Sequence, residues 1–291
     1  RRPFHRRQSG PRARGIHDWW RQILNTLRHI GWVAATLLLS LGGCASVRQT
    51  LGKSLISDQA EIDLGRQVAD QVLSQYRVHP DPILQSYVSD IAEPLVQASL
   101  VDRQGVTYSI TLLDEPEQVN AFALPGGPIF VFSGLLLLAD DEAEVAGVLA
   151  HEIGHIVGRH SANQMATKVG VDALLGMALG EQPGEVARLA AELGAGGTFA
   201  QFSRDDERES DEFGVAYTIA AGYDPIGLLS FFEKLRQLES GGGNDALGRF
   251  FASHPATDER IRRLQKRIER AGSPGGERGE ARHKLMVRRL R

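Results

Sequence analysis

The chain has 291 residues, of which 42% are hydrophobic and 24% are charged, a composition typical of a globular protein. Its formal net charge is −3, but the first 30 residues carry eight arginines and a single acid, a net charge of +7. No charged residue lies between residues 31 and 43, so the chain from Cys44 onward has a net charge of −10. A mildly acidic body argues against non-specific nucleic-acid binding, which depends on neutralising phosphates, and we expect no nucleic-acid partner.

The arginine-rich start leads into a short apolar segment over residues 30–43 that ends in small residues. This is the pattern of a secretory signal peptide, and the apolar segment is shorter than the roughly 20 residues of a spanning helix. Leu41-Gly42-Gly43-Cys44 resembles a bacterial lipobox, which makes Cys44, the only cysteine, the expected lipidation site. The alternative is an uncleaved N-terminal anchor with an incidental cysteine.

We therefore predict a signal peptide over residues 1–43 and a lipidated tether over residues 44–57. Ala45, rather than an aspartate, follows the cysteine, which is similar to outer-membrane sorting. The expected location is the periplasmic side of a bacterial cell envelope, with the protein held by lipid at the outer membrane.

Hydrophobic periodicity and chain breakers predict the elements in chain order. Helices are expected at 58–76, 83–99, 134–139, from 141 onward, twice within 162–200, and at 205–221, 226–238 and 257–270. Strands are expected at 106–112, 120–124 and 129–132, and the prolines around the turn at 125–128 favour a sheet edge. These elements predict one α+β domain over residues 58–271, mostly helical with a small sheet. The polar, Gly-rich residues 272–291 are predicted to be a disordered tail.

The chemistry of the chain centres on His151-Glu152-Ile153-Gly154-His155, an H-E-x-x-H sequence inside a predicted helix. Residues four apart lie on one helix face, so both histidines can bind one zinc ion while Glu152 takes a proton from the attacking water. The alternative is two surface histidines on an amphipathic helix. Capping-box spacing between Asp141 and Glu144, followed by apolar residues at helical period, favours the zinc site.

A catalytic zinc takes three protein ligands, so a third is expected elsewhere in the chain. His160 lies one residue early for the pattern H-E-x-x-H-x-x-G-x-x-H, and a slip of one residue rotates a helical side chain by about 100°. We therefore interpret it as a polar residue near the helix end. Glu207 and Asp211 lie one helical turn apart, and we predict Glu207 as the third ligand, with Asp211 bonded to the outer nitrogen of His151. The alternative is an acidic, solvated helix start.

Four ordered motifs resemble those of the M48 family of zinc metallopeptidases. They are H-E-I-G-H at 151–155, S-R-x-x-E-R-E-x-D-x-x-G at 203–214, A-G-Y-D-P at 221–225 and S-H-P-A-T-D-E-R-I at 253–261. The segment 120–127 is also similar to the family's edge strand, and the resemblance covers residues 58–270. It implies a gluzincin-type fold whose edge strand borders the active site, with His151, His155 and Glu207 on zinc and Glu152 as general base. The compact bacterial lipoprotein members are the most similar kind.

Three further predictions concern residues around the zinc. In some members of the family a histidine of the His-Pro motif occupies the fourth zinc position and keeps the enzyme idle, which implies this role for His254; alternatively His254 caps the last helix through Pro255. Arg260 is predicted to stabilise the oxyanion of the tetrahedral intermediate, or is a surface arginine. An extended substrate is expected to pair with the edge strand, unless that strand only covers the core. Its predicted substrate-binding residues are Asn120, Ala121, Phe122 and Ala123.

The sequence thus predicts an endopeptidase with one Zn²⁺ per chain that cleaves unfolded or misassembled envelope proteins in outer-membrane protein quality control. The alternative function is a periplasmic, chaperone-like binding protein whose zinc site is latched or structural. Both functions use unfolded envelope proteins as partners and the N-terminal lipid as the membrane contact. The oligomeric state is not predicted.

Overall fold

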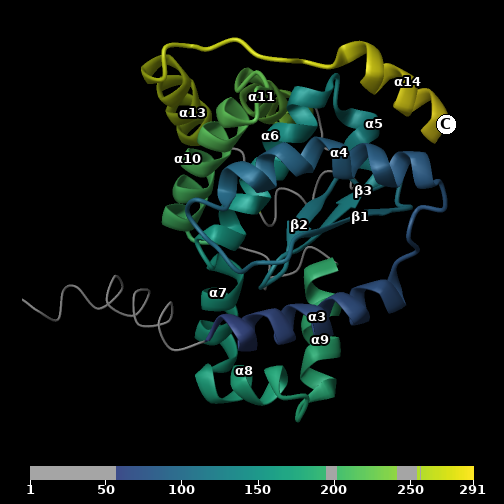
Figure 1. Cartoon of the computed structure of the whole chain (residues 1–291), viewed down its shortest axis with the longest axis vertical. Helices are drawn as coiled ribbons and strands as arrows, with labels where there is room; N and C mark the ends of the chain where they lie inside the picture. Colours follow the sequence, from purple (N-terminus) through teal and green to yellow (C-terminus); the bar gives the residue numbers. More distant parts are fainter. Residues whose placement is uncertain (1–56, 195–201, 241–253, 256) are drawn as a thin grey trace, which may run out of the picture. The chain divides into compact units, whose positions relative to one another are not determined.

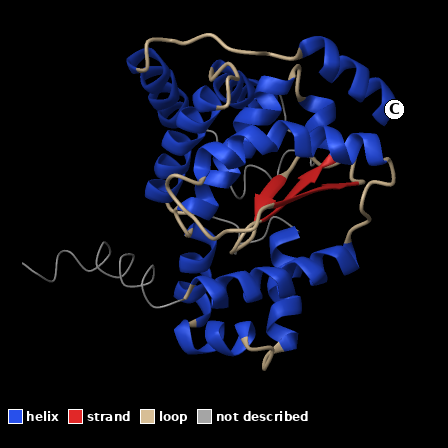
Figure 2. Cartoon of the chain, in the orientation of Figure 1, coloured by secondary structure: helices blue, strands red, loops and turns tan. Residues whose placement is uncertain are grey.

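A small mixed sheet lies among the helices (Figures 1 and 2). The computed structural model describes residues 57–194, 202–240, 254–255 and 257–291. Strand β1 (Ser109–Leu113) pairs in parallel with β3 (Pro128–Phe132), and β3 pairs antiparallel with β2 (Ala121–Ala123). The strand order β1-β3-β2 leaves β2 at an edge. The predicted fold class, mostly helical with a small sheet, is confirmed, although the first strand begins three residues later than predicted.

The predicted signal peptide, the tether up to residue 56 and Cys44 lie outside the described residues. Within the part of the chain that the structure describes, no helix has both the length and the apolar character needed to cross a bilayer.

The two faces of the sheet pack against different helices because alternate side chains of a strand point to opposite sides. One face carries Phe122, Phe130 and Phe132 and joins the core of α3 (Asp58–Gln75), α7 (His160–Val169), α8 (Val171–Ala178) and α9 (Pro183–Gly194). The other face carries Ala123, Ile129 and Val131, which pack with α4 (Pro82–Ser99) and α6 (Glu142–Val157). In Figure 1, α4 and α3 accordingly flank the strands on opposite sides.

Helix α6, which carries the H-E-x-x-H sequence, is the central helix of the domain. Every residue from Glu142 to Ile156 is buried, as expected for a helix surrounded by other elements. Its neighbours are α4, α10 (Arg204–Ala220) and α11 (Ile226–Ser240). Gly154 permits the close approach of α10, because a Cβ there would lie 3.0 Å from the Cα of Ser210. Helix α6 is preceded by α5 (Ser133–Leu138), and α13 (Asp258–Arg270) packs on α10 and α11.

The prediction of a disordered tail from residue 272 is wrong, because Glu280–Leu290 forms α14 and packs on α4, α5 and α6. His283 anchors this helix: its Nδ1 lies 2.7 Å from the hydroxyl of Tyr87, and its Nε2 lies 2.9 Å from the carbonyl oxygen of Ala139. Arg282 adds an ion pair of 2.6 Å to Asp90. The folded domain therefore extends beyond residue 271 to α14.

Candidate metal centre

Three elements bring four possible metal ligands together. His151 and His155 come from α6, Glu207 from the first turns of α10, and His254 from the segment before α13. One donor atom of each residue lies within 4.8 Å of the others, and all four side chains are buried. The helical spacing of the two histidines and the Gly154 contact with α10 explain how Glu207 reaches them across 52 residues of sequence.

The spacing of the donor atoms fits a four-coordinate zinc ion. With zinc–ligand bonds of about 2.0–2.1 Å, the corners of a tetrahedron lie about 3.3 Å apart. Nε2 of His151 lies 3.1 Å from Nε2 of His155 and 3.3 Å from Nδ1 of His254. The Glu207 carboxylate lies 3.6 Å from His151, 3.5 Å from His155 and 2.9 Å from His254. Imidazole nitrogens and a carboxylate oxygen are also the ligand types that zinc prefers.

Charges and burial prepare these groups for a cation. Burial holds the pKa of His155 well below its usual value, so its ring is neutral and has a lone pair for a metal. Burial alone would raise the pKa of Glu207, but the charges of Arg260 and His254 outweigh it and hold that pKa well below the usual range. The buried glutamate is therefore ionised.

Glu152 lies beside the donor atoms and is completely buried. Its Oε1 lies 3.4 Å from Nε2 of His254. Burial raises the pKa of Glu152, although the charges of His254 and His151 and the amide of Ala123 oppose this effect. A carboxylate with a raised pKa is better suited to accept and return a proton near neutral pH than an exposed glutamate.

Asp211 and Arg260 contact the candidate ligands: Asp211 contacts His151, and Arg260 contacts Glu207. Oδ1 of Asp211 lies 3.1 Å from Nδ1 of His151. Arg260 is only 6% exposed and donates to both oxygens of Asp211, at 2.9 and 2.7 Å, while its Nη1 lies 2.5 Å from Glu207. Burial would raise the pKa of Asp211, but Arg260 and His151 hold it below its usual value. Arg260 thus neutralises two buried carboxylates that would otherwise repel each other.

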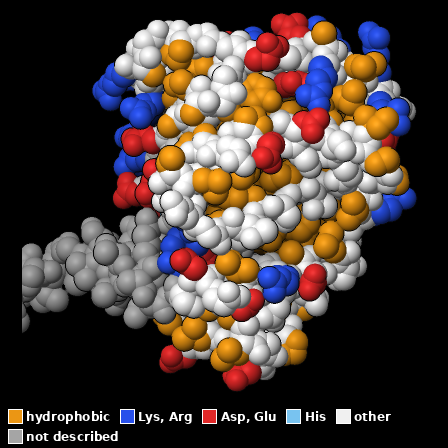
Figure 3. All heavy atoms as spheres, viewed as in Figure 1, with side chains coloured by type: hydrophobic (Ala, Val, Ile, Leu, Met, Phe, Trp, Pro, Cys, Tyr) orange, Lys and Arg blue, Asp and Glu red, His pale blue; other side chains and the backbone are white. Residues whose placement is uncertain are grey.

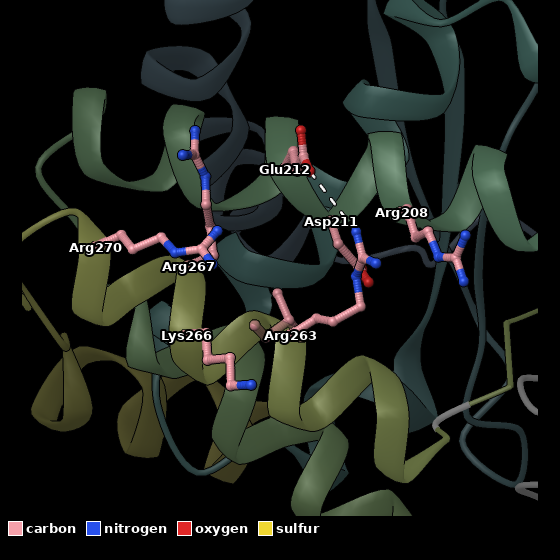
Figure 4. A pocket seen from close by; sticks show the side chains of 8 residues that line it. Arg208, Asp211, Glu212, Arg263, Lys266, Arg267 and Arg270 are labelled. Atoms are coloured by element: carbon pink, nitrogen blue, oxygen red, sulfur yellow. Dashed lines mark ion pairs between the residues drawn. The ribbon is translucent and has the colours of Figure 1, made fainter.

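Two pockets border this network and share Arg208 and Arg263 in their linings. One, of about 380 Å³, reaches Glu207, Arg260, Phe202 and Pro255, so it opens onto the metal-site residues. The other, of about 280 Å³, lies between α10 and α13 and touches the network only at Asp211. Figure 4 shows that basic side chains surround this second pocket, with Arg263 reaching toward Glu212. Its remaining lining residues are Arg208, Leu264, Lys266, Arg267 and Arg270.

The face of the domain seen in Figure 3 carries many exposed hydrophobic side chains, unlike the basic lining of the second pocket. In Figure 3, hydrophobic side chains form a band across this face between α4 and α3, and charged side chains are spread around its outline, including the side of α10 and α13.

The edge of β2 that does not pair with β3 borders the site. Phe132 donates to the carbonyl of Asn120 and Leu124 donates to that of Pro128, so even-numbered residues of β2 pair with β3. By the alternation of an antiparallel ladder, Ala121 and Ala123 present their backbone groups outward. The hydroxyl of Ser161 already occupies the carbonyl of Ala123, at 3.0 Å. Of the four residues predicted to bind substrate, Ala121 and Ala123 have their main-chain groups on this edge, and all three residues of the strand are buried.

The structure adds one residue to the site. His160, interpreted from the sequence as a polar residue near the helix end, is fully buried with Nδ1 3.0 Å from Nδ1 of His155. His160 does lie near the helix end, since α6 ends at Val157 and a new helix begins at His160, and it is not one of the four candidate donors; its burial against His155 was not predicted. The glycine at position 158 was the available signal for a helix end.

An H-E-x-x-H helix joined to a glutamate from a second helix defines the donor set of a metal-dependent peptidase. Comparison with known proteins agrees: the model described as "Peptidase family M48" matches residues 82–268, and the chain belongs to this family.

Three relatives illustrate the similarity. The mitochondrial metalloendopeptidase OMA1 of Arabidopsis thaliana is 31% identical over 76% of this chain and 45% of its own length. OMA1 of Schizosaccharomyces pombe is 30% identical over 69% of this chain and 57% of its own length. The beta-barrel assembly-enhancing protease of Escherichia coli is 27% identical over 80% of this chain and 48% of its own length. The chain thus spans about half the length of these relatives.

Proposed function

We propose that this chain is a zinc-dependent endopeptidase that cleaves unfolded or misassembled proteins of the bacterial cell envelope. The observation that carries the proposal is the buried cluster of His151, His155, Glu207 and His254, whose donor atoms have the spacing of a zinc site, with Glu152 beside it. The relative named as a beta-barrel assembly-enhancing protease supports a setting in outer-membrane protein quality control. The lipidated Cys44 and the outer-membrane location remain part of this proposal.

A zinc ion held by His151, His155 and Glu207 would supply a Lewis acid and lower the pKa of a water molecule. Glu152 accepts a proton from the attacking water and returns it to the nitrogen of the leaving group, so one carboxylate serves as base and then as acid. Asp211 holds Nδ1 of His151 and fixes which nitrogen faces the metal. Arg260 keeps Glu207 ionised, and its predicted oxyanion role belongs to the same proposal.

The edge of β2 is the proposed substrate-binding strand. An extended chain that pairs with Ala121 lies close to Glu152, because the next outward residue, Ala123, already bonds Glu152 through its amide and Ser161 through its carbonyl. Main-chain pairing selects unfolded segments and reads little of their sequence, which fits a quality-control enzyme. Asn120 and Phe122 then act by shaping the strand.

Replacing Ala121 by proline tests the strand, because it removes one outward N–H at the first residue of β2. We expect KM for an extended peptide to rise by up to about tenfold, the equivalent of one hydrogen bond, with kcat and zinc content unchanged. Ala121→Gly, which keeps the N–H, is the matched control and should behave as wild type. An Ala121→Pro enzyme with an unchanged KM would exclude this edge as the docking strand.

A second function, a chaperone-like binder with a latched site, is favoured by one observation. Nδ1 of His254 lies 2.9 Å from Glu207 and its Nε2 lies 3.4 Å from Glu152, so this side chain fills the position that an attacking water needs. Burial alone would lower the pKa of His254, but the charges of Glu207 and Glu152 outweigh it and raise that pKa. The same charges favour the contact of His254 with the two glutamates.

The His254→Ala variant separates the two functions. If His254 latches a peptidase, the zinc-loaded variant should cleave an unfolded protein faster than wild type. If the chain is a binder, both proteins should retain the unfolded protein without cutting it. Equal cleavage by both proteins would show that His254 has no latching role.

A further inference from the structure

His160 contacts the predicted metal ligand His155 on the side away from the donor cluster, and it is not itself one of the candidate donors. Its side chain is fully buried, with Nδ1 3.0 Å from Nδ1 of His155 and Nε2 3.1 Å from Oε2 of Glu209. His155 therefore has both ring nitrogens engaged, Nε2 in the donor cluster and Nδ1 with His160. Phe202 stacks on the same ring, with centroids 3.9 Å apart.

One arrangement of protons satisfies these contacts when Nε2 of His155 binds a metal. A ligating nitrogen carries no proton, so the proton of the neutral ring is on Nδ1 and is donated to Nδ1 of His160. His160 accepts there and donates its own Nε2 proton to Glu209, with an oxygen of Asp206 3.6 Å from the same nitrogen. The hydroxyl of Ser210, 3.2 Å from Nδ1 of His160, shares that acceptor.

The backbone between α6 and α7 is bent in the way that this contact requires. In a continuous helix His160 would point about 140° away from His155, because it lies five residues further on. Instead Arg159 adopts a left-handed conformation with φ of 58°, which is unfavourable for a residue with a Cβ. Its side chain is held by Glu61, with Nε 2.7 Å from Oε2.

Gly158 completes the bend. A Cβ at this position would lie 2.3 Å from Nε2 of His160 and 2.5 Å from its Cε1, so the imidazole occupies the space above the glycine. The absent side chain at 158, the left-handed residue at 159 and the imidazole at 160 thus form one local structure. All three features serve to put the His160 ring against His155.

We propose that His160 is a positioning residue for the metal ligand His155, fixing its tautomer and ring orientation through a chain of hydrogen bonds that ends at Glu209. The side chain of Glu209 is 42% exposed, so this chain connects the buried cluster to the surface of α10. The inference rests on the metal site of the proposed function, and it concerns metal affinity as well as catalysis.

Zinc affinity of the full chain, measured by competition with a chromophoric chelator, tests the role without any assay of cleavage. His160→Phe keeps the ring volume but removes the acceptor and should weaken zinc binding by about 10- to 100-fold. His160→Gln, which can accept from His155 and donate to Glu209, should restore most of the affinity. His283→Phe is the matched control: it replaces another buried histidine far from the cluster and should leave zinc affinity unchanged.

Wild-type affinity in a folded His160→Phe protein would overturn the proposal, and so would equal losses in the Phe and Gln variants. If the Phe variant does not fold, an NMR measurement on the wild-type protein tests the proposal instead. In zinc-loaded, ¹⁵N-labelled protein the N–H···N bond predicts a coupling between Nδ1 of His155 and Nδ1 of His160, and its absence would overturn the proposal. A chain that binds zinc normally but cuts nothing would contradict the proposed peptidase and leave this comparison of affinities standing.

Discussion

Two buried histidines of this domain have similar burial and opposite surroundings. His155 and His283 are both at most 1% exposed, and burial lowers the pKa of each ring. Around His283 the protein supplies a hydroxyl for one nitrogen and a carbonyl for the other, so the neutral ring is satisfied. Around Nε2 of His155 the neighbours are another imidazole nitrogen and a carboxylate oxygen.

The different partners of the two histidines indicate different roles, one in the stability of the fold and one in a candidate metal site. A neutral imidazole that meets one donor and one acceptor stabilises a fold by itself. Several lone pairs that converge on one point repel one another, and a cation bound between them removes this repulsion. Burial and the direction of the pKa shift are the same at the two places, so only the partners distinguish a structural histidine from a candidate metal ligand.

The largest change in stability is expected from replacing Arg260, the positively charged side chain beside the candidate metal ligands. Arg260→Ala leaves Glu207 and Asp211 buried without their partner, which should lower the free energy of unfolding by about 3–5 kcal/mol. Denaturant titration without added zinc measures this. The same variant, zinc-loaded, tests the oxyanion role, since a normal kcat would remove Arg260 from the mechanism.

Arg263→Ala is the control for that measurement. Arg263 lies one turn further along α13, its side chain is 44% exposed and it stands 3.9 Å from Glu212. An exposed pair of this kind contributes roughly 0–1 kcal/mol. Equal losses in the two variants would contradict the distinction between a buried compensating charge and a surface arginine.

A smaller effect is expected at His283. Replacement by phenylalanine leaves the hydroxyl of Tyr87 and the carbonyl of Ala139 without this partner, which should cost about 1–3 kcal/mol of stability. Zinc affinity should not change. A loss of zinc binding in this variant would show that the two histidine environments are not independent.

The pH dependence of stability has a definite sign at His283. Its pKa in the folded protein is lowered from the ordinary 6.5, so as the pH falls below about 6.5 the unfolded chain binds a proton that the folded chain does not. Stability is therefore retained above this pH and decreases below it. Urea titrations between pH 8 and pH 5 should show a steeper decrease for wild type than for His283→Phe, and parallel curves would contradict the assignment.

The sequence predicts the metal region better than the His283 region for a physical reason. His151 and His155 lie one helical turn apart, and so do Glu207 and Asp211, and spacing along a helix is visible in one sequence. The strands at 120–124 and 129–132 are likewise found with their order along the chain, because alternation and turn residues are local signals.

Helix α14 escaped prediction because its partners are distant. Arg282 pairs with Asp90 and His283 bonds Tyr87, contacts that span 192 and 196 residues. Seen locally, a charged, Gly-flanked segment has the composition of a solvated tail. The contact of His160 with His155 was not predicted for a related reason. It depends on the left-handed conformation of Arg159, which the sequence does not indicate because Arg159 is not a glycine.

The most direct test of the proposed peptidase compares the zinc-loaded wild type with Glu152→Gln on a labelled unfolded protein. The variant keeps all four candidate ligands, so both proteins should bind one zinc per chain. We expect the wild type to cleave and the variant to be slower by about 10²- to 10⁴-fold, the usual contribution of a general base. Equal cleavage by the two proteins would contradict the role of Glu152. If neither cuts, even after His254 is replaced by alanine, the chain is not the peptidase proposed here.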